Sequence, residues 1–161
     1  MSNAGFHFSP PTLSADLLDN LKIGVVTSVW NSHITNALKT GCFKELASWG
    51  ITQDQIIELD VPGAFELPIG AQKLFEHSNV DAVVCLGAVI KGDTPHFDFV
   101  CQGATQGIME VGLKFSKPCI YGLITTLNEQ QAIDRIGGTH GHKGEEAAKT
   151  AMYMLSEFYK L

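Results

Sequence analysis

The sequence predicts a three-layer α/β/α sandwich built around a four-stranded parallel sheet. Three observations predict it: four short runs rich in β-branched and apolar residues, a helical pattern after each run, and no repeat or linker dividing the chain. Strands that alternate with helices at this spacing form parallel sheets covered on both faces. The 161 residues suffice for one domain with a full hydrophobic core. We expect that domain to span 21–161, behind an N-terminal arm at 1–20.

The predicted elements alternate along the chain without interruption. The expected strands lie at 22–29, 56–61, 82–90 and 119–125, and the expected helices at 32–49, 64–77, 95–115, from near 129, and 143–161. A glycine-rich segment at 137–144 is expected to form a bend between the last two helices. Right-handed crossovers place all four strand-to-helix loops at the carboxyl edge of the sheet, where open α/β folds bind ligands. The functional residues are therefore sought in those four loops.

Charge and cysteine content exclude several classes of partner. The chain has 11 Lys and Arg against 17 Asp and Glu, and this net charge of -6 disfavours nucleic acid and anionic membranes. The four cysteines form no Cys-x-x-Cys pair, which is typical of a reducing cytoplasm. Apolar runs are of strand length, so no membrane span is expected. His140 and His142 lack further ligands at metal spacing, and no GxGxxG follows the first strand, so neither a metal nor a dinucleotide cofactor is expected.

The first two loops carry an aromatic residue and a carboxylate. Trp30 follows the first strand, where its ring can stack on a flat heterocycle, although a lone aromatic is more often a packing residue. Glu66 lies in the first turn of the second helix, after Gly63. A carboxylate at that position also stabilises a helix N-terminus without any ligand. For each of these two residues, the surrounding sequence alone leaves both a ligand contact and a structural role open.

The third loop, 87–98, combines features of an anion site. Thr94 followed by Pro95 is typical of an N-cap and first helical residue, which places His96 in the opening turn. Free N–H groups near Gly92, the Thr94 hydroxyl and the positive helix end favour an anion, and His96 can transfer protons beside it. A surface histidine in a capped helix is the alternative.

The fourth loop leads to the only arginine of the chain. Asn128 is the expected helix cap, with Gln131 as its capping-box partner, and Arg135 lies one to two turns further on. An arginine suits bidentate binding of a phosphate. An ordinary solvated side chain is the alternative.

Together these segments resemble the lumazine synthase family over nearly the whole chain, from about Lys22 to Phe158. The motifs that carry the resemblance are Trp30-Asn31, Gly63-Ala64-Phe65-Glu66-Leu67-Pro68, the run from Gly87 to Asp98, and Arg135 followed by Lys143-Gly144. The resemblance implies a flavodoxin-like fold and a cytoplasmic transferase of riboflavin biosynthesis. This enzyme condenses 5-amino-6-(D-ribitylamino)uracil with 3,4-dihydroxy-2-butanone 4-phosphate to 6,7-dimethyl-8-ribityllumazine, and it needs no metal or cofactor.

The resemblance also implies a role for individual residues. Trp30 and Tyr121 would flank the pyrimidinedione, and His96 would transfer protons. The family more often has Phe where this chain has Tyr121. Further contacts to the pyrimidinedione and its ribityl chain would come from Ala64, Phe65, Glu66, Ala88, Val89 and Ile90, and the phosphate would be held by Asp93, Thr94 and Arg135, with Lys91 adding charge.

Family members are pentamers with active sites between neighbouring subunits, and many assemble into sixty-subunit icosahedral shells. The resemblance therefore implies a homo-oligomer in which the arm pairs with an adjacent copy, with riboflavin synthase as a candidate partner. The absence of extra residues between Arg135 and Lys143 favours the shell, whereas Pro10, Pro11, His140 and His142 count against it. Three rivals remain: a riboflavin synthase of the same architecture, a flavodoxin-like binding module or receiver domain, and a shell protein that stores a flavin-like ligand.

Overall fold

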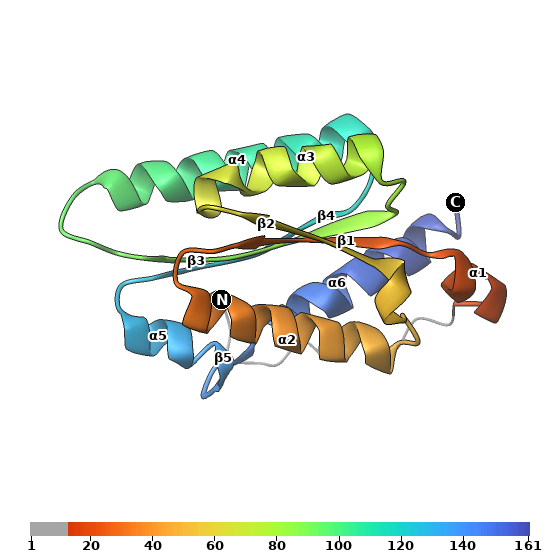
Figure 1. Ribbon diagram of the computed structural model, residues 1–161, viewed down its shortest axis with the longest axis horizontal. Helices are drawn as coiled ribbons and strands as arrows, with labels where there is room; N and C mark the ends of the chain where they lie inside the picture. The colour runs from red at the N-terminus through yellow and green to blue at the C-terminus, as the bar shows by residue number, and fades with distance from the viewer. Residues whose placement is uncertain (1–12) are drawn as a thin grey trace.

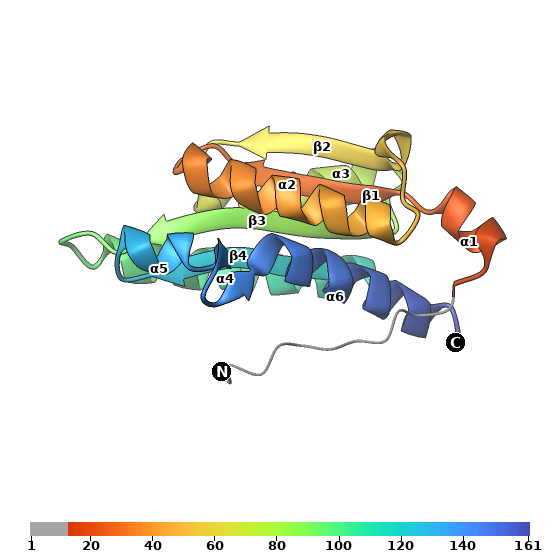
Figure 2. The same cartoon turned by 90° about the horizontal axis from the view of Figure 1, so that it is seen from below.

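A single parallel sheet forms the middle layer of the molecule. The structure is a computed structural model that describes residues 13–161. Its four strands are β1 (Ile23–Ser28), β2 (Ile56–Val61), β3 (Ala82–Ile90) and β4 (Cys119–Thr126), all parallel, in the order β2-β1-β3-β4. Figures 1 and 2 show α3 and α4 on one face of this sheet and α2, α5 and α6 on the other. The predicted three-layer, flavodoxin-like sandwich is confirmed.

The residue types of the strands follow from their places in the sheet. The central strand β1 is buried at all six positions, as expected for a strand covered on both faces. The edge strand β2 alternates instead, and its exposed residues Glu58 and Asp60 lie on the α2 face, within ion-pair distance of Lys39. Side chains of β1 and β3 alternate between two apolar cores: Val25 and Val84 pack toward α2 and α6, whereas Val26 and Val83 pack toward α3 and α4.

The helices have nearly the predicted bounds. They are α2 (Ser32–Ser48), a 3₁₀ turn η2 (Ala64–Glu66) leading into α3 (Leu67–His77), α4 (His96–Phe115), α5 (Glu129–Ile133) and α6 (Lys143–Phe158). α2 starts at Ser32 as predicted, with Asn31 as its N-cap. α4 starts one residue later than predicted, because Pro95 and not Thr94 is its N-cap. A second 3₁₀ turn, η1 (Gln53–Gln55), precedes β2.

The glycine-rich bend between α5 and α6 is a small hairpin. Strands β5 (Ile136–Gly138) and β6 (Gly141–His142) pair antiparallel, with Gly137 at φ 114° and Gly141 at φ 75°. Only glycine adopts such angles readily. The hairpin leads directly into α6, so α6 begins where the sequence predicted.

The arm predicted at 1–20 falls mostly outside the described residues, which begin at residue 13. Its last part is the short helix α1 (Ala15–Asn20), capped by the Ser14 side chain. The sequence showed no helical period there. Leu21, directly after α1, is buried in the core beside α2.

Candidate active site

Trp30 stands at the carboxyl edge of the sheet, with most of its ring exposed. The loops after β1 and β2 are joined by two backbone bonds, from Val29 N to Val61 O at 2.8 Å and from Trp30 N to Pro62 O at 3.1 Å. Trp30 is 69% exposed, and its ring lies against Gly63, where an added Cβ would stand 3.1 Å from Cε3. The ring is therefore not part of the core, and one broad side of it is open to a ligand or a partner.

Asn31 fixes this loop against the neighbouring strand, a role that the sequence analysis did not assign. Its backbone is left-handed at φ 60°, and its Nδ2 donates to Ala88 O at 3.0 Å. Asn is among the few residues that tolerate this conformation. An Asn directly after a predicted strand was the sequence feature that could have indicated this role.

The segment after β2 presents an aromatic ring and a capping carboxylate. Glu66 Oε2 accepts a hydrogen bond from Gly63 N at 3.0 Å, so the capping role considered from the sequence is confirmed. Phe65 is 60% exposed, and the edge of its ring contacts α4 at Gly103, where an added Cβ would lie 2.6 Å from Cε2. Ala64 is buried beneath them. Trp30, Phe65 and Glu66 are thus brought together at the ends of β1 and β2.

The end of β3 leaves part of its backbone without a neighbouring strand. Pairing with β1 stops at Thr27 and Leu86, whereas pairing with β4 continues to Ile90 and Thr126. Ala88 O points toward β1, since it accepts the Asn31 amide. Because peptide groups alternate in direction along a strand, the Ile90 N–H and C=O point the same way. Ala88 and Ile90 therefore present an open backbone edge, whereas the backbone of Val89 pairs with β4. Their side chains pack inward, those of Ala88 and Ile90 on one core and that of Val89 on the other.

The loop between β3 and α4 projects from the carboxyl edge (Figure 1). Asp93, Thr94 and His96 are all exposed, and Thr94 Oγ1 accepts a weak bond from His96 N at 3.4 Å. α4 starts here and runs for 20 residues, so its positive end faces this loop. An added Cβ at Gly92 would meet no atom within 4 Å. The arrangement leaves room for an anion beside the His96 imidazole.

Arg135 lies on the other face of the sheet from His96. The sequence predicted that Arg135 lies within this helix. It lies two residues beyond α5 instead, because α5 ends at Ile133. Its Nη1 donates to Gln131 O at 2.8 Å, which holds the half-buried side chain and leaves other guanidinium N–H groups for a phosphate. Asn128 caps α5 as predicted, accepting from Gln131 N at 3.0 Å, while Gln131 accepts from Leu127 N instead of Asn128 N.

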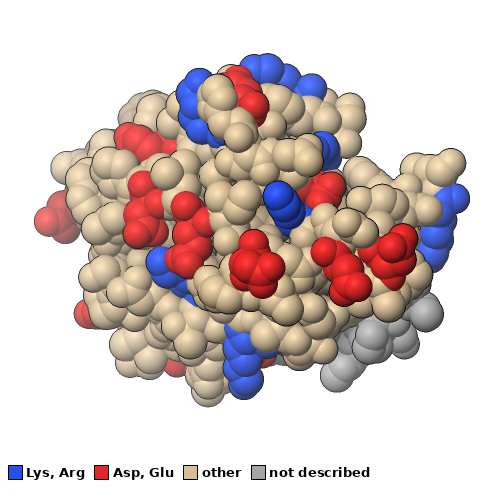
Figure 3. Space-filling model, turned by 45° about the vertical axis from the view of Figure 1, so that its right-hand side comes forward, with Lys and Arg blue, Asp and Glu red and all other residues tan. Residues whose placement is uncertain are grey.

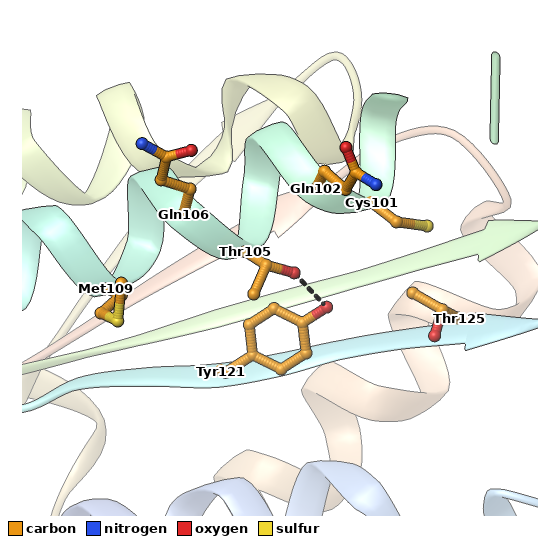
Figure 4. Close-up of a pocket in the computed structure, with 7 residues that line it drawn as sticks. All are labelled: Cys101, Gln102, Thr105, Gln106, Met109, Tyr121 and Thr125. Carbon is orange, nitrogen blue, oxygen red and sulfur yellow. Dashed lines mark hydrogen bonds between the residues drawn. The ribbon is translucent and has the colours of Figure 1, made fainter. Parts of the chain in front are cut away.

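Tyr121 lies away from Trp30, on the opposite flank of α4. Gly103 and Gly107 face Phe65 and Pro68 on one flank of that helix. On the other flank, the Thr105 hydroxyl is hydrogen-bonded to the Tyr121 hydroxyl across 2.9 Å (Figure 4). The helix therefore separates the two aromatic residues expected to flank one ligand. A single chain does not bring them together.

Neither a metal-binding cluster nor a membrane-spanning helix occurs among the described residues. Within 13–161, no three His, Cys, Asp or Glu side chains are placed to hold a metal ion. No helix in that range is long and apolar enough to cross a membrane. Acidic and basic side chains are interspersed on the face shown in Figure 3, which carries no continuous basic patch for a phosphate polymer.

The fold and the carboxyl-edge loops define an open α/β protein of the flavodoxin-like type, a class that binds ligands at the carboxyl ends of its parallel strands. Residues 20–158 match the model of the 6,7-dimethyl-8-ribityllumazine synthase family, and the chain belongs to this family. It is a transferase-type enzyme of riboflavin biosynthesis.

Three of the similar proteins, each named 6,7-dimethyl-8-ribityllumazine synthase, show the extent of the likeness. The protein of Cytophaga hutchinsonii is 48% identical over 157 residues, which cover 98% of this chain and 99% of the relative. That of Bacteroides fragilis is 48% identical over 141 residues, or 88% of this chain and 99% of the relative. That of Salinibacter ruber is 41% identical over 153 residues, or 94% and 98%. The similarity therefore extends over nearly the whole of each protein.

Proposed function

We propose that this enzyme condenses 5-amino-6-(D-ribitylamino)uracil with 3,4-dihydroxy-2-butanone 4-phosphate, releasing 6,7-dimethyl-8-ribityllumazine, phosphate and water. The observation that carries the proposal is the placement of aromatic residues on both flanks of α4. Trp30 and Phe65 are more than half exposed on one flank, and Tyr121 is 43% exposed on the other. Large exposed aromatic rings of this kind mark binding surfaces.

The two flanks form one complete site when the Trp30 flank of one copy meets the Tyr121 flank of the next. Such a contact joins two different surfaces, so its repetition generates a closed ring when the rotation between copies closes. In that ring, each site takes Trp30, Phe65 and His96 from one chain and Tyr121 and Arg135 from its neighbour. We propose a pentamer, located in the cytoplasm and able to build an icosahedral shell that could enclose riboflavin synthase. Pairing of the arm with an adjacent copy belongs to the same proposal.

The pyrimidinedione is bound by stacking and by backbone groups. Trp30 offers an open π-face, and the open edge of Ala88 and Ile90 offers N–H and C=O groups that match the ring's own donors and acceptors. Val89 fills the side toward α4, and Ala64, Phe65 and Glu66 close the far side. A flat heterocycle is therefore held mainly by ring stacking and by backbone groups.

The phosphate substrate is held at the start of α4. The segment at Asp93 and Thr94, the helix end and the neighbour's Arg135 hold the phosphate, and Lys91 adds charge. The reaction then runs through imine formation at the ketone, elimination of phosphate, tautomerisation, and ring closure with loss of water. Holding the two reactants face to face supplies much of the acceleration. The His96 imidazole transfers protons at the developing imine and during elimination.

The direct test incubates the purified protein with both substrates and follows lumazine fluorescence together with inorganic phosphate. Equal amounts of the two products are expected, and omission of either substrate should abolish both signals. A fall in lumazine fluorescence, which would mean that the protein consumes lumazine instead of forming it, would favour the riboflavin synthase rival. Binding of a lumazine without turnover would favour the storage protein, and either result would overturn the proposal.

A further inference from the structure

Helix α4 contains three glycines, Gly103, Gly107 and Gly112. Glycine destabilises the interior of a helix relative to alanine, so a glycine there is explained by a close contact or by a function. Gly107 has a close contact, because an added Cβ would lie 2.6 Å from Cγ of Pro68, whose ring is fixed to the backbone of α3. Gly103 differs from it, since the side chain that Gly103 faces is exposed and can rotate.

The side chain that faces Gly103 is that of Phe65. An added Cβ at residue 103 would lie 2.6 Å from Cε2, 3.1 Å from Cδ2 and 3.6 Å from Cζ of its ring. These three atoms form one edge of the ring, so the ring meets α4 edge-first and occupies the space that a side chain at residue 103 would fill. Because Phe65 is 60% exposed, most of its surface contacts no other part of the chain. The contact at Gly103 therefore defines how close to α4 the ring lies.

The backbone of α4 is held too firmly to make room for a side chain at residue 103. Ala104, Ile108 and Val111 are at most 6% exposed and anchor the helix in the core that it shares with α3 and the sheet. The Phe65 ring turns about single bonds and moves more easily. Since non-bonded carbon atoms pack at about 3.5–4.0 Å, an alanine at residue 103 would displace the near edge of the ring by about 1 Å.

We propose that Gly103 is a positioning residue of the active site: the absence of a side chain at residue 103 sets the position of the Phe65 ring, and this ring closes one side of the site. The inference rests on the proposed function, in which Phe65 contacts the pyrimidinedione. Gly103 itself touches no substrate and acts only through Phe65. Any larger residue at 103 pushes the ring away from α4, and a misplacement of about 1 Å in an active site lowers the rate by up to about 10²-fold.

The test is a double-mutant cycle measured by calorimetry on the assembled protein, with the ribitylaminopyrimidine and inorganic phosphate as separate probes. Gly103→Ala is expected to weaken pyrimidine binding about tenfold and to leave phosphate binding unchanged. In the Phe65→Ala background, which has no ring to displace, Gly103→Ala should not change pyrimidine binding any further. Gly112→Ala, the same change near the other end of α4, is the matched control and should bind both probes like the wild type.

Thermal unfolding distinguishes positioning from a purely structural role. Gly103→Ala should melt at or above the wild-type temperature, because alanine favours the helix and the flexible ring moves aside. Wild-type pyrimidine affinity in Gly103→Ala, an equal loss in the Phe65→Ala background, or a lower melting temperature would each overturn the proposal.

The two proposals fail separately. A wild type that binds the pyrimidine but forms no product would refute the proposed function alone. Full turnover by the wild type, together with wild-type pyrimidine affinity in Gly103→Ala, would refute the role of Gly103 alone.

Discussion

Arg135 donates one hydrogen bond to Gln131 O, and the proposed clamp uses the rest of its guanidinium fork. A hydrogen bond to a charged group contributes about 1.5–3 kcal/mol, and the proposed clamp uses more than one. Arg135→Ala is therefore expected to lower kcat/KM for the phosphate substrate on the order of 10²-fold or more.

His96→Ala should lower kcat by about 10²-fold without abolishing turnover, because the positioning of both substrates is retained.

Steady-state kinetics with each substrate varied separately checks both expectations. Arg135→Lys is the matched control, since it keeps the charge and loses the planar fork, and an intermediate loss is expected. Full activity after Arg135→Ala would refute the clamp. Complete loss of turnover after His96→Ala would show that proton transfer contributes more than positioning.

Asn31 combines a left-handed backbone with a bond to Ala88 O, and two substitutions separate these contributions. Asn31→Gly keeps the conformation and loses the bond, so the free energy of unfolding should fall by about 1 kcal/mol. Asn31→Ala also strains the backbone, which adds about 1–2 kcal/mol. Urea denaturation at one fixed protein concentration measures both, and equal losses would mean that the backbone angle contributes nothing.

Sequence reasoning placed the loops of the candidate site at the carboxyl edge of the sheet, but it did not predict how individual residues are held. Trp30 and His96 could be predicted because their positions after a strand and at a helix start are local features. The Asn31 bond joins residues 57 positions apart, and no local pattern encodes such a contact. The start of α5 could be predicted because its capping residue is a local feature. The end of α5 depends on the hairpin that follows, so Arg135 was wrongly expected inside the helix.

Helices α2 and α6 approach closely at Gly144, which sets a sharp test of their packing. A Cβ at Gly144 would lie 2.0 Å from the backbone oxygen of Leu38, an atom that cannot move aside. Gly144→Ala is therefore expected to destabilise the fold by about 3 kcal/mol or more, the range of severe overpacking. Gly92→Ala is the matched control, because its Cβ would meet nothing within 4 Å.

Thermal unfolding of the two variants gives the comparison, with Gly92→Ala expected within about 0.5 kcal/mol of the wild type. Similar melting temperatures for Gly144→Ala and the wild type would contradict this account of the α2 and α6 contact.

The four strands were predicted to within a residue or two because each is a short apolar run bounded by polar or turn residues. The hairpin β5–β6 was missed for a physical reason. Its glycines at positive φ are equally compatible with an open bend, and the pairing of Ile136 with His142 is not visible in so short a segment. Helix α1 is only 6 residues long, too short to show a helical period.

At the scale of the whole molecule, the two flanks of α4 predict an assembly. Met109 is 59% exposed in a groove beside Tyr121, on the flank that is proposed to meet the next copy. Met109→Glu would place a charge in that contact, where leaving it unpaired is costly. Wild-type protein is expected to sediment at five times the mass of the chain or as a larger shell, and Met109→Glu should shift the distribution toward single chains.

Asn36→Glu introduces the same charge on an exposed position of α2, on the other face of the sheet, and serves as the control. Its sedimentation should match that of the wild type. Since each proposed site takes residues from two copies, turnover by Met109→Glu should fall in parallel with the fraction of assembled protein and recover at higher protein concentration. A dissociated variant with full activity would contradict the shared site, because a lone chain holds Trp30 and Tyr121 on opposite flanks of one helix.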